Sequence, residues 1–306
     1  MKGETYMKKN KIKIFRLLPL LLTLFLALNI LEYANKSTNT TMGEFAEMQV
    51  HFIDVGQGDC TLITSGGEAM LIDAGNNDKG TLIQSYLQKQ GISTLDIVIC
   101  THGDSDHSGG MDVILYKFDC KTVIMPDTSK VMNDTATFRD VLSSMKAKNY
   151  KNTVPVVGDV YKLGSATVTI IAPNSYEYGE HRNNYSVGVL VQNGENRFLF
   201  TGDAEEDAEV DILRSNSNIS ADVYKVAHHG SRTSTTKKFL DAINPTYAVI
   251  SCGEDNPYGH PHAEVMNRLR KSRIKVFRTD EQGTIIATSD GRNITWNCNP
   301  IYYFPN

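Results

Sequence analysis

The sequence predicts an α/β fold, with sheets covered by helices, that is preceded by a segment directed to a membrane. Three observations support this prediction. Short apolar strands begin near residue 49, amphipathic helical stretches alternate with strands in both halves, and residues 1–34 place clustered cations before an apolar run. A hydrophobic content of 41% and a charged content of 22% are ordinary for a folded protein.

Residues 1–34 are typical of a signal peptide or a signal anchor. Five clustered basic residues between Lys8 and Arg16 precede the apolar run Leu17 to Leu31, after which the sequence turns polar. The run is shorter than the roughly 20 apolar residues of a full span, yet no small-x-small cleavage site follows it. Both a cleaved signal and an uncleaved anchor are therefore open. Either one leaves the basic flank in the cytoplasm and makes the rest of the chain extracytoplasmic, exported or membrane-anchored.

Residues 35–48 form a polar linker, and one folded domain is expected over residues 49–306. Strands are expected over 49–53, 60–63, 69–72, 95–100 and 122–125, and helices over 81–90, 111–118 and 135–148. Two hairpins follow, at 160–172 around Gly164-Ser165 and at 187–200 around Asn193-Gly194. The last third alternates, with helices over 204–214, 234–243 and 262–271 and strands over 222–227, 246–251, 274–277 and 284–288.

Charge and cysteine content exclude some classes of protein. After residue 34 the chain holds 25 basic and 33 acidic residues, a net charge of −8, which is a poor overall field for attracting nucleic acid. The five cysteines are odd in number and have no CxxC spacing. This pattern argues against a disulfide framework and against a thiolate zinc finger.

The densest chemical signal is the run from Thr101 to Gly110. Four potential metal ligands fall within six residues, directly after the strand over 95–100 and before two glycines. As a loop, this run would aim His102 and Asp104 at one metal ion and Asp106 and His107 at a second. The alternative is a solvated polar turn, which rarely places histidine and aspartate at this density beside a buried strand.

This run resembles the His-x-His-x-Asp-His motif of the metallo-β-lactamase superfamily, with Asp104 in place of the second histidine. Together with residues 52–59 (FIDVGQGD), it is similar to the metallo-β-lactamase domain of ComEC-type DNA-uptake proteins. Further similar segments are residues 199–203 (LFTGD), 225–231 (KVAHHGS) and 258–262 (YGHPH). The resemblance covers residues 49–290 and implies a four-layered αβ/βα fold. It lacks the polytopic membrane channel of those proteins, so we do not expect a DNA-translocating pore.

The resemblance also implies roles for later residues. Asp203 matches the aspartate that bridges two metals; from residue type alone it would cap the helix over 204–214. One histidine of the pair His228-His229 should bind the second metal while the other faces the substrate and acts in catalysis. We favour His228 as the ligand. Asn184 stands where many members have a third histidine, and as a weak ligand it is expected to contact water or substrate.

The expected cofactor is a pair of divalent metal ions. Zn²⁺ is the family default, and the carboxylate and amide at positions 104 and 184 make Mn²⁺ more competitive. Two ions about 3.5–4 Å apart can share a hydroxide and clamp both oxygens of a displacement. Asp106 and Asp203 would orient that hydroxide, and Asp106 could carry its proton.

Other polar residues divide into structural and substrate-binding candidates. Asp54, Asp59 and Asp73 lie in turns and are expected to hold loop amides rather than to react. Hydroxyl, amine and imidazole groups suit the oxygens of a phosphate. The substrate-contact candidates of these kinds are Lys225, Ser231, His260 and His262. Residues 259–262 could equally be a rigid loop that leads into a helix.

Three functions therefore compete. The first is an extracytoplasmic phosphodiesterase or nuclease-like hydrolase acting on DNA. The second is a surface phosphoesterase, for instance one that removes phosphorylcholine from teichoic acid, which suits the acidic charge better. The third is a non-catalytic binding module that retains a metal. A β-lactamase is not expected, because Asp104 and Asn184 break the three-histidine first site of those enzymes. No protein partner is predicted.

Overall fold

The computed structural model describes residues 45–131, 135–215 and 217–301. The expected leader, residues 1–34, and most of the linker lie outside these residues. Within the described ranges, no helix combines the length and apolar character needed to cross a bilayer. The folded unit begins at Phe45.

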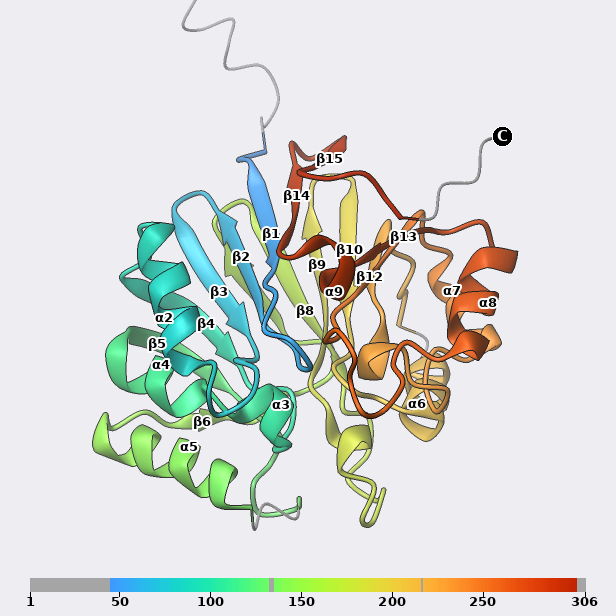
Figure 1. Cartoon of the computed structure of the whole chain (residues 1–306). Helices are drawn as coiled ribbons and strands as arrows, with labels where there is room; N and C mark the ends of the chain where they lie inside the picture. Colours follow the sequence, from blue (N-terminus) through green and yellow to red (C-terminus); the bar gives the residue numbers. More distant parts are fainter. Residues whose placement is uncertain (1–44, 132–134, 216, 302–306) are drawn as a thin grey trace, which may run out of the picture. The chain divides into compact units, whose positions relative to one another are not determined.

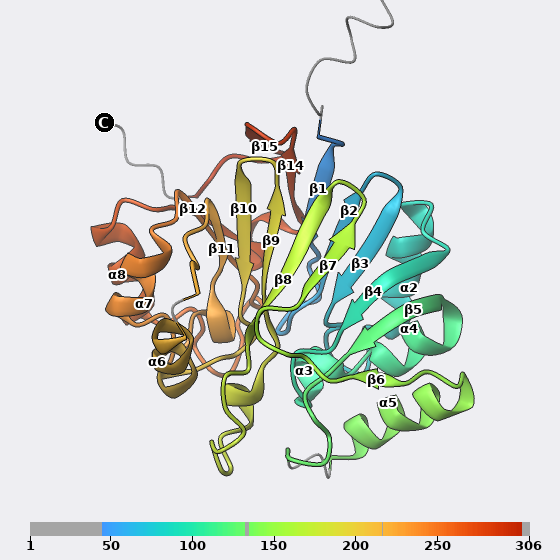
Figure 2. The ribbon, with the colours of Figure 1, turned by 180° about the vertical axis from the view of Figure 1, so that it is seen from behind.

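Two sheets form the centre of this unit (Figures 1 and 2). The eight-stranded sheet has the order β15 (Ile294–Trp296), β14 (Ile285–Ser289), β1 (Met48–Phe52), β2 (Thr61–Ser65), β3 (Glu68–Ile72), β4 (Thr94–Ile99), β5 (Asp119–Ile124), β6 (Asn152–Thr153). The seven-stranded sheet has the order β13 (Lys275–Arg278), β12 (Tyr247–Ile250), β11 (Val223–Lys225), β10 (Asn196–Phe200), β9 (Gly188–Asn193), β8 (Ala166–Ala172), β7 (Val160–Leu163). Each sheet joins an antiparallel part to a parallel part.

Helices cover the outer face of each sheet. The first sheet carries α2 (Gly80–Lys89), α4 (Met111–Lys117) and α5 (Ala136–Ala147), and the second carries α6 (Glu206–Arg214), α7 (Lys237–Ile243) and α8 (Ala263–Lys271). Strand β3 shows why this layering forms. Met70 and Ile72 enter the core between the sheets, whereas Ala69 and Leu71 pack under the helices. A strand that is apolar on both faces needs cover on both sides. The predicted α/β fold with two helix-covered sheets is confirmed.

The elements that the sequence did not reveal are short. They are β6, β15, the helical turn α3 (Ser105–Ser108), the 3-10 turns η1 (Arg182–Tyr185) and η2 (Ala227–Gly230), and α9 (Thr279–Gln282). The prediction of an open loop through the run 102–107 was wrong from Ser105 onward. The carbonyl of Asp104 accepts hydrogen bonds from the amides of His107 (3.1 Å) and Ser108 (2.8 Å), which closes a helical turn. Asp106 and His107 are therefore positioned by a helix rather than by an extended loop.

Candidate metal centre

The polar residues meet where strands of both sheets end. Loops that follow β1, β4, β10 and β11 converge at the end of the molecule marked by α3 (Figure 1). Ligands from such loops lie close together because the carboxyl ends of neighbouring parallel strands share one edge of a sheet.

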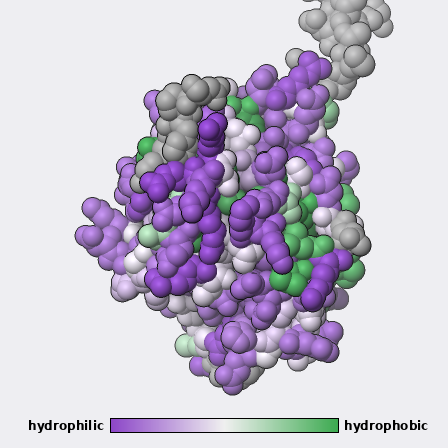
Figure 3. All heavy atoms as spheres, turned by 90° about the vertical axis from the view of Figure 1, so that its right-hand side faces the viewer, coloured by the Kyte–Doolittle hydropathy of each residue, from purple (hydrophilic) through white to green (hydrophobic). Residues whose placement is uncertain are grey.

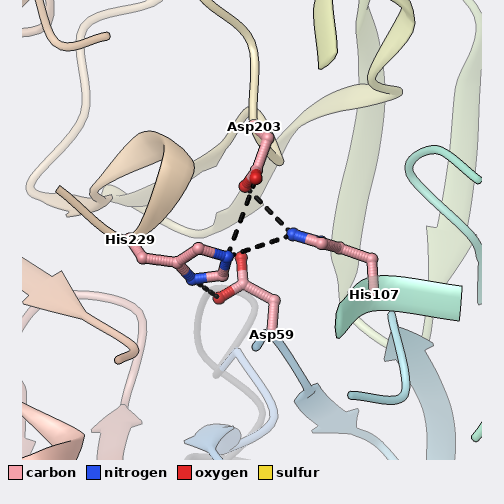
Figure 4. Close-up of side chains that lie close together, drawn as sticks. All are labelled: Asp59, His107, Asp203 and His229. Carbon is pink, nitrogen blue, oxygen red and sulfur yellow. Dashed lines mark hydrogen bonds and ion pairs between the residues drawn. The ribbon is translucent and has the colours of Figure 1, made fainter. Parts of the chain in front are cut away.

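Four buried side chains form a compact group at this point: Asp59, His107, Asp203 and His229 (Figure 4). One ligand atom from each lies within 4.8 Å of the others. The Nε2 atom of His107 is 3.0 Å from Oδ1 of Asp203 and 3.3 Å from Nε2 of His229. The same His229 atom is 3.6 Å from Oδ2 of Asp203. Carboxylate and imidazole donors at these separations can hold a divalent ion.

Both imidazoles of the group are oriented through their other nitrogen. Nδ1 of His107 donates to Oδ2 of Asp73 (2.8 Å), and Nδ1 of His229 donates to the carbonyl of Ser251 (2.9 Å). Asp73 is itself held by the amide and the hydroxyl of Thr101, at 2.8 and 2.7 Å. This arrangement directs the lone pairs of both Nε2 atoms into the group, as is usual for histidines that bind metal.

His102 lies beside this group. Its Nδ1 contacts the hydroxyls of Thr101 (3.1 Å) and Ser186 (3.4 Å), and its ring lies 4.3 Å from that of His107. Within the described part of the chain, its buried Nε2 has no hydrogen-bond partner. The nearest carboxylate oxygen, on Asp104, is 3.8 Å away. A buried nitrogen without a partner is costly unless it receives a ligand.

Charge in the centre is strongly coupled. Burial would raise the pKa of the Asp203 carboxyl, but His107 and His229 hold it well below its usual range. Burial would lower the pKa of His107, but Asp203 and Asp73 raise it well above its usual range. Burial and His107 lower the pKa of His102, which keeps that ring neutral. The donor set thus combines ionised carboxylates with imidazoles that face a shared point, and it fits one or more divalent cations.

Asp106 joins the same group from the turn α3. Its Oδ2 lies 3.2 Å from Nε2 of His229. Burial tends to raise its pKa, while contact with His229 and the charge of His107 produce a net lowering. Asp104 is more open, with 39% of its side chain exposed. The turn therefore directs Asp106 and His107 to one side and leaves Asp104 near His102. This is compatible with the prediction that the two pairs bind different metal ions.

The histidine pair is divided between the interior and the rim. His229 is 1% exposed, whereas His228, which we call the rim histidine, is 21% exposed. Nδ1 of the rim histidine lies 3.3 Å from Oε1 of Glu205 and 3.2 Å from the hydroxyl of Thr233, and its Nε2 is 3.7 Å from Oδ2 of Asp203. Both histidines have positive φ angles, 51° and 52°, which are uncommon for residues with a side chain. This geometry favours His229 as the ligand, the reverse of our first choice.

Lys225 does not face the substrate side. Its side chain is 3% exposed, and Nζ donates to Oδ2 of Asp59 (2.8 Å) and to the carbonyl of Val226 (3.2 Å). The predicted substrate contact needs an accessible ammonium group, and this one is buried and paired. Asp59, which we expected only to hold loop amides, belongs to the four-residue group and is the partner of Lys225.

Three other substrate candidates take part in hydrogen bonds that hold the rim together. Oδ1 of Asn184 accepts from the amide of Glu205 (2.9 Å), and Nδ1 of His262 accepts from the amide of Arg232 (3.0 Å). The hydroxyl of Ser231, a side chain only 4% exposed, lies 3.0 Å from that of Thr233. These contacts give each residue a structural role, and their contact with substrate stays a prediction.

His260 and Tyr258 form an aromatic edge next to the histidine pair. The rings of His260 and His229 are stacked with centroids 6.1 Å apart, and Tyr258 stacks on His260 at 5.5 Å. Tyr258 is 62% exposed. Neither Tyr258 nor Glu205 was among the predicted site residues. The one sign of a role for Glu205 in the sequence was its position two residues after Asp203. We interpreted that position as part of the helix expected over 204–214, not as a partner for a histidine.

Comparisons with known proteins agree with this geometry. Residues 53–254 match the family model described as metallo-beta-lactamase superfamily. The chain is 30% identical to ComE operon protein 3 of Bacillus subtilis over 279 residues, which cover 84% of this chain and 35% of that protein. It is 34% identical to Recombination protein 2 of Haemophilus influenzae over 242 residues, 78% of this chain and 28% of that protein. The chain thus spans about a third of the length of these relatives.

Solved structures resemble the fold. The metallo-beta-lactamase fold protein YhfI of Bacillus subtilis aligns with a TM-score of 0.51 at 11% identity, over 78% of this chain and 98% of that one. A variant of the β-hydroxylase CmlA aligns with a TM-score of 0.50 at 13% identity, over 78% of this chain and 53% of that one. At such identities the likeness shows a shared fold alone.

Proposed function

The chain belongs to the metallo-beta-lactamase superfamily, and from this premise we propose that it is a metal-dependent phosphodiesterase that acts outside the cytoplasm. The observation that carries the proposal is the buried group Asp59, His107, Asp203 and His229, whose ligand atoms lie within 4.8 Å of one another. Hydrolysis in this family is metal-dependent, and the group provides the carboxylate and imidazole donors that such chemistry needs.

Two sets of residues would hold the ions. His107, Asp203 and His229 surround one position, with Asp106 beside them. His102 and Asp104 would hold a second ion. When bound, divalent ions would activate water and stabilise negative charge on a phosphoryl oxygen. Zn²⁺ and Mn²⁺ both suit these donors.

The protein's own groups would orient the reactants. We assign Asp106 the role of accepting a hydrogen bond from the attacking water and taking its proton, which its contact with Nε2 of His229 at 3.2 Å supports. The rim histidine is more exposed than His229 and is held by Glu205, so it is placed to contact a substrate oxygen. His260 and Tyr258 extend this contact surface along the same edge.

DNA is the first substrate that we propose. The support is the similarity to proteins whose names refer to competence and recombination, of which this chain matches only a part. A surface phosphorylcholine ester is the second candidate. The exposed Tyr258 ring beside His260 favours it, because aromatic faces bind quaternary ammonium groups.

A panel of substrates tests the proposal. The purified chain is supplied with Zn²⁺ or Mn²⁺ and given single-stranded DNA, bis-(p-nitrophenyl) phosphate, p-nitrophenyl phosphorylcholine and nitrocefin. We expect metal-dependent hydrolysis of phosphodiesters, lost in Asp203→Asn and kept in Asp207→Asn, a control on the exposed first turn of α6. Cleavage of phosphorylcholine alone would select the second candidate.

Two results would overturn the proposal. If the wild type turned over every phosphodiester no faster than Asp106→Ala does, the turnover would be background, and a binding module without catalysis would be indicated. Turnover of nitrocefin would show a β-lactamase instead.

A further inference from the structure

A strongly basic surface lies on the outer layer of the second sheet. Arg270 and Lys271 end the helix α8, and Arg273 follows in the next turn; all three are exposed. No acidic residue occurs between Glu264 and Asp280. Figure 3 looks onto this side of the molecule, most of which is hydrophilic. In a domain that is acidic overall, this stretch is a local exception.

The other arginines of the stretch are engaged inside the protein. Arg268 donates to the carbonyls of Ser234 (3.1 Å) and Thr235 (2.9 Å), and Arg278 forms an ion pair with Asp280. These contacts explain Arg268 and Arg278 as parts of the fold. The three remaining cations, Arg270, Lys271 and Arg273, are exposed, and we call them the α8 cations. Arg270 donates to Oδ1 of Asn267 on the same helix (2.9 Å).

An aromatic pocket lies where β12 and β13 begin. Tyr247, Lys275, Thr295 and Trp296 line a hollow of about 590 Å³. The Trp296 ring lies 5.1 Å from that of Tyr247 and stacks on Phe277 at 4.1 Å. Nζ of Lys275 lies 5.2 Å from the centre of the Tyr247 ring. Lys275 lies two residues after Arg273, the last of the α8 cations, so the pocket and the basic surface adjoin.

Both features lie at the end of the strands away from the metal centre. Strand β12 runs from Tyr247 to Ile250, and the next residue, Ser251, receives the hydrogen bond from His229. At about 3.3 Å per residue, the start of β12 is roughly 13 Å from that contact. Strand β13 is parallel to β12. A polymer bound at the metal centre would therefore have to pass along the whole strand to reach Trp296.

The chain enters the domain at this same end. Strand β1 starts at Met48 and runs toward the loop that carries Asp59. Val50 of β1 pairs with Ala287, and Ala287 pairs with Trp296. Two strand spacings amount to about 10 Å. The described part of the chain therefore begins, at Phe45, at the end of the domain that carries the pocket.

We propose that this distal end, the α8 cations together with the Trp296 pocket, binds an anionic phospholipid surface. Basic side chains are attracted to anionic headgroups, and each one raises the partition coefficient onto the membrane about fivefold. Tryptophan and tyrosine favour the interface between water and lipid. Basic and aromatic groups also suit single-stranded nucleic acid, but the distance from the metal centre and the nearness of the chain entry favour lipid. The docked domain would hold its metal centre away from the bilayer.

The protein contains a single tryptophan, Trp296, so its own fluorescence tests the proposal. The full chain is reconstituted into vesicles of phosphatidylcholine, with or without phosphatidylglycerol, and quenched with acrylamide or with brominated lipid. We expect phosphatidylglycerol to lower acrylamide quenching to about half and to raise quenching by brominated lipid. High salt should reverse both changes, since it screens surface charge.

Charge reversal provides the matched comparison. Arg270→Glu, Lys271→Glu and Arg273→Glu combined should abolish the effect of phosphatidylglycerol. Lys89→Glu, Lys237→Glu and Lys238→Glu combined change the net charge equally on other exposed positions and should keep it. If the quenching of Trp296 in the wild type changed neither with phosphatidylglycerol nor with salt, the proposal would be overturned. This result relies on no variant. Protection of Trp296 by single-stranded DNA but not by lipid would overturn it as well. Neither outcome depends on catalysis.

Discussion

Replacing Asp73 by asparagine would test how the centre holds its histidines. The carboxylate accepts three hydrogen bonds: from Nδ1 of His107 (2.8 Å), and from the hydroxyl (2.7 Å) and the amide (2.8 Å) of Thr101. An asparagine offers one acceptor oxygen and an NH₂ group, so at least one of these donors loses its partner. A neutral amide would also accept from Nδ1 of His107 less strongly than the carboxylate does, so the ring would be held less firmly with Nε2 toward Asp203.

The expected effect of Asp73→Asn has two parts. Loss of a buried hydrogen bond to a charged group should lower the free energy of unfolding of the metal-free protein by about 1.5–3 kcal/mol. Loss of the carboxylate behind a metal-binding histidine should weaken metal affinity by about 10–100-fold. Urea unfolding measures the first quantity, and calorimetric titration with Zn²⁺ or Mn²⁺ measures the second.

Asp54→Asn is the matched control for this substitution. Asp54 lies in a turn at the same end, where its Oδ1 accepts from the amide of Gly56 (3.0 Å). It should leave metal affinity unchanged. If Asp73→Asn also bound metal as the wild type does, the orientation of His107 by Asp73 would not matter for the centre, and our reasoning would be refuted.

Three further predictions concern other contacts. Lys225→Met should lower the free energy of unfolding by about 3–5 kcal/mol, because it leaves the Asp59 carboxylate buried without its cation; adding Asp59→Asn should restore most of this loss in urea unfolding, and no recovery would contradict the pairing. Glu205→Ala should reduce turnover by about 10–100-fold with the metal content unchanged in elemental analysis, since the buried group is intact; loss of metal would show instead that the rim histidine is a ligand. Burial lowers the pKa of His51 to about 4, below its value of 6.5 in the unfolded chain, so its contribution to stability is full above pH 6.5 and is lost as the pH falls toward 4. In urea unfolding, this loss of up to about 3 kcal/mol should be absent in His51→Gln, and an equal acid dependence in both proteins would refute it.

The sequence predicted the fold well because its long elements have clear patterns. Strands such as β3 and helices such as α5 carry an alternation or a period that burial on defined faces requires. The turn α3 was missed, because its four residues bear the polar side chains of the centre and show no apolar period. The short strand β15 has only three residues, too few for a pattern, and is defined by its antiparallel pairing with the preceding strand β14.

The centre was predictable by residue type and less so by contact. The run 102–107 indicated a metal centre, but Asp59 was interpreted as a holder of loop amides. Its partner Lys225 is 166 residues away in the chain, and local sequence gives no sign of that pairing. His228 points to the rim and His229 to the interior because both residues have left-handed backbone conformations. The local sequence does not predict this conformation. Such features arise from tertiary packing, which overrides local preference.

The four-residue group draws Asp59 and His107 from one half of the chain and Asp203 and His229 from the other. Asp59 and His107 follow strands of the eight-stranded sheet, and Asp203 and His229 follow strands of the seven-stranded sheet. Each sheet has its own helices and its own outer core. A cation held here would link the loops of the two sheets. Saturation with metal would therefore raise the resistance of the whole domain to heat and proteases. Scarcity of the ion would then shorten the lifetime of the protein as well as stop its activity, which would couple its abundance to metal supply.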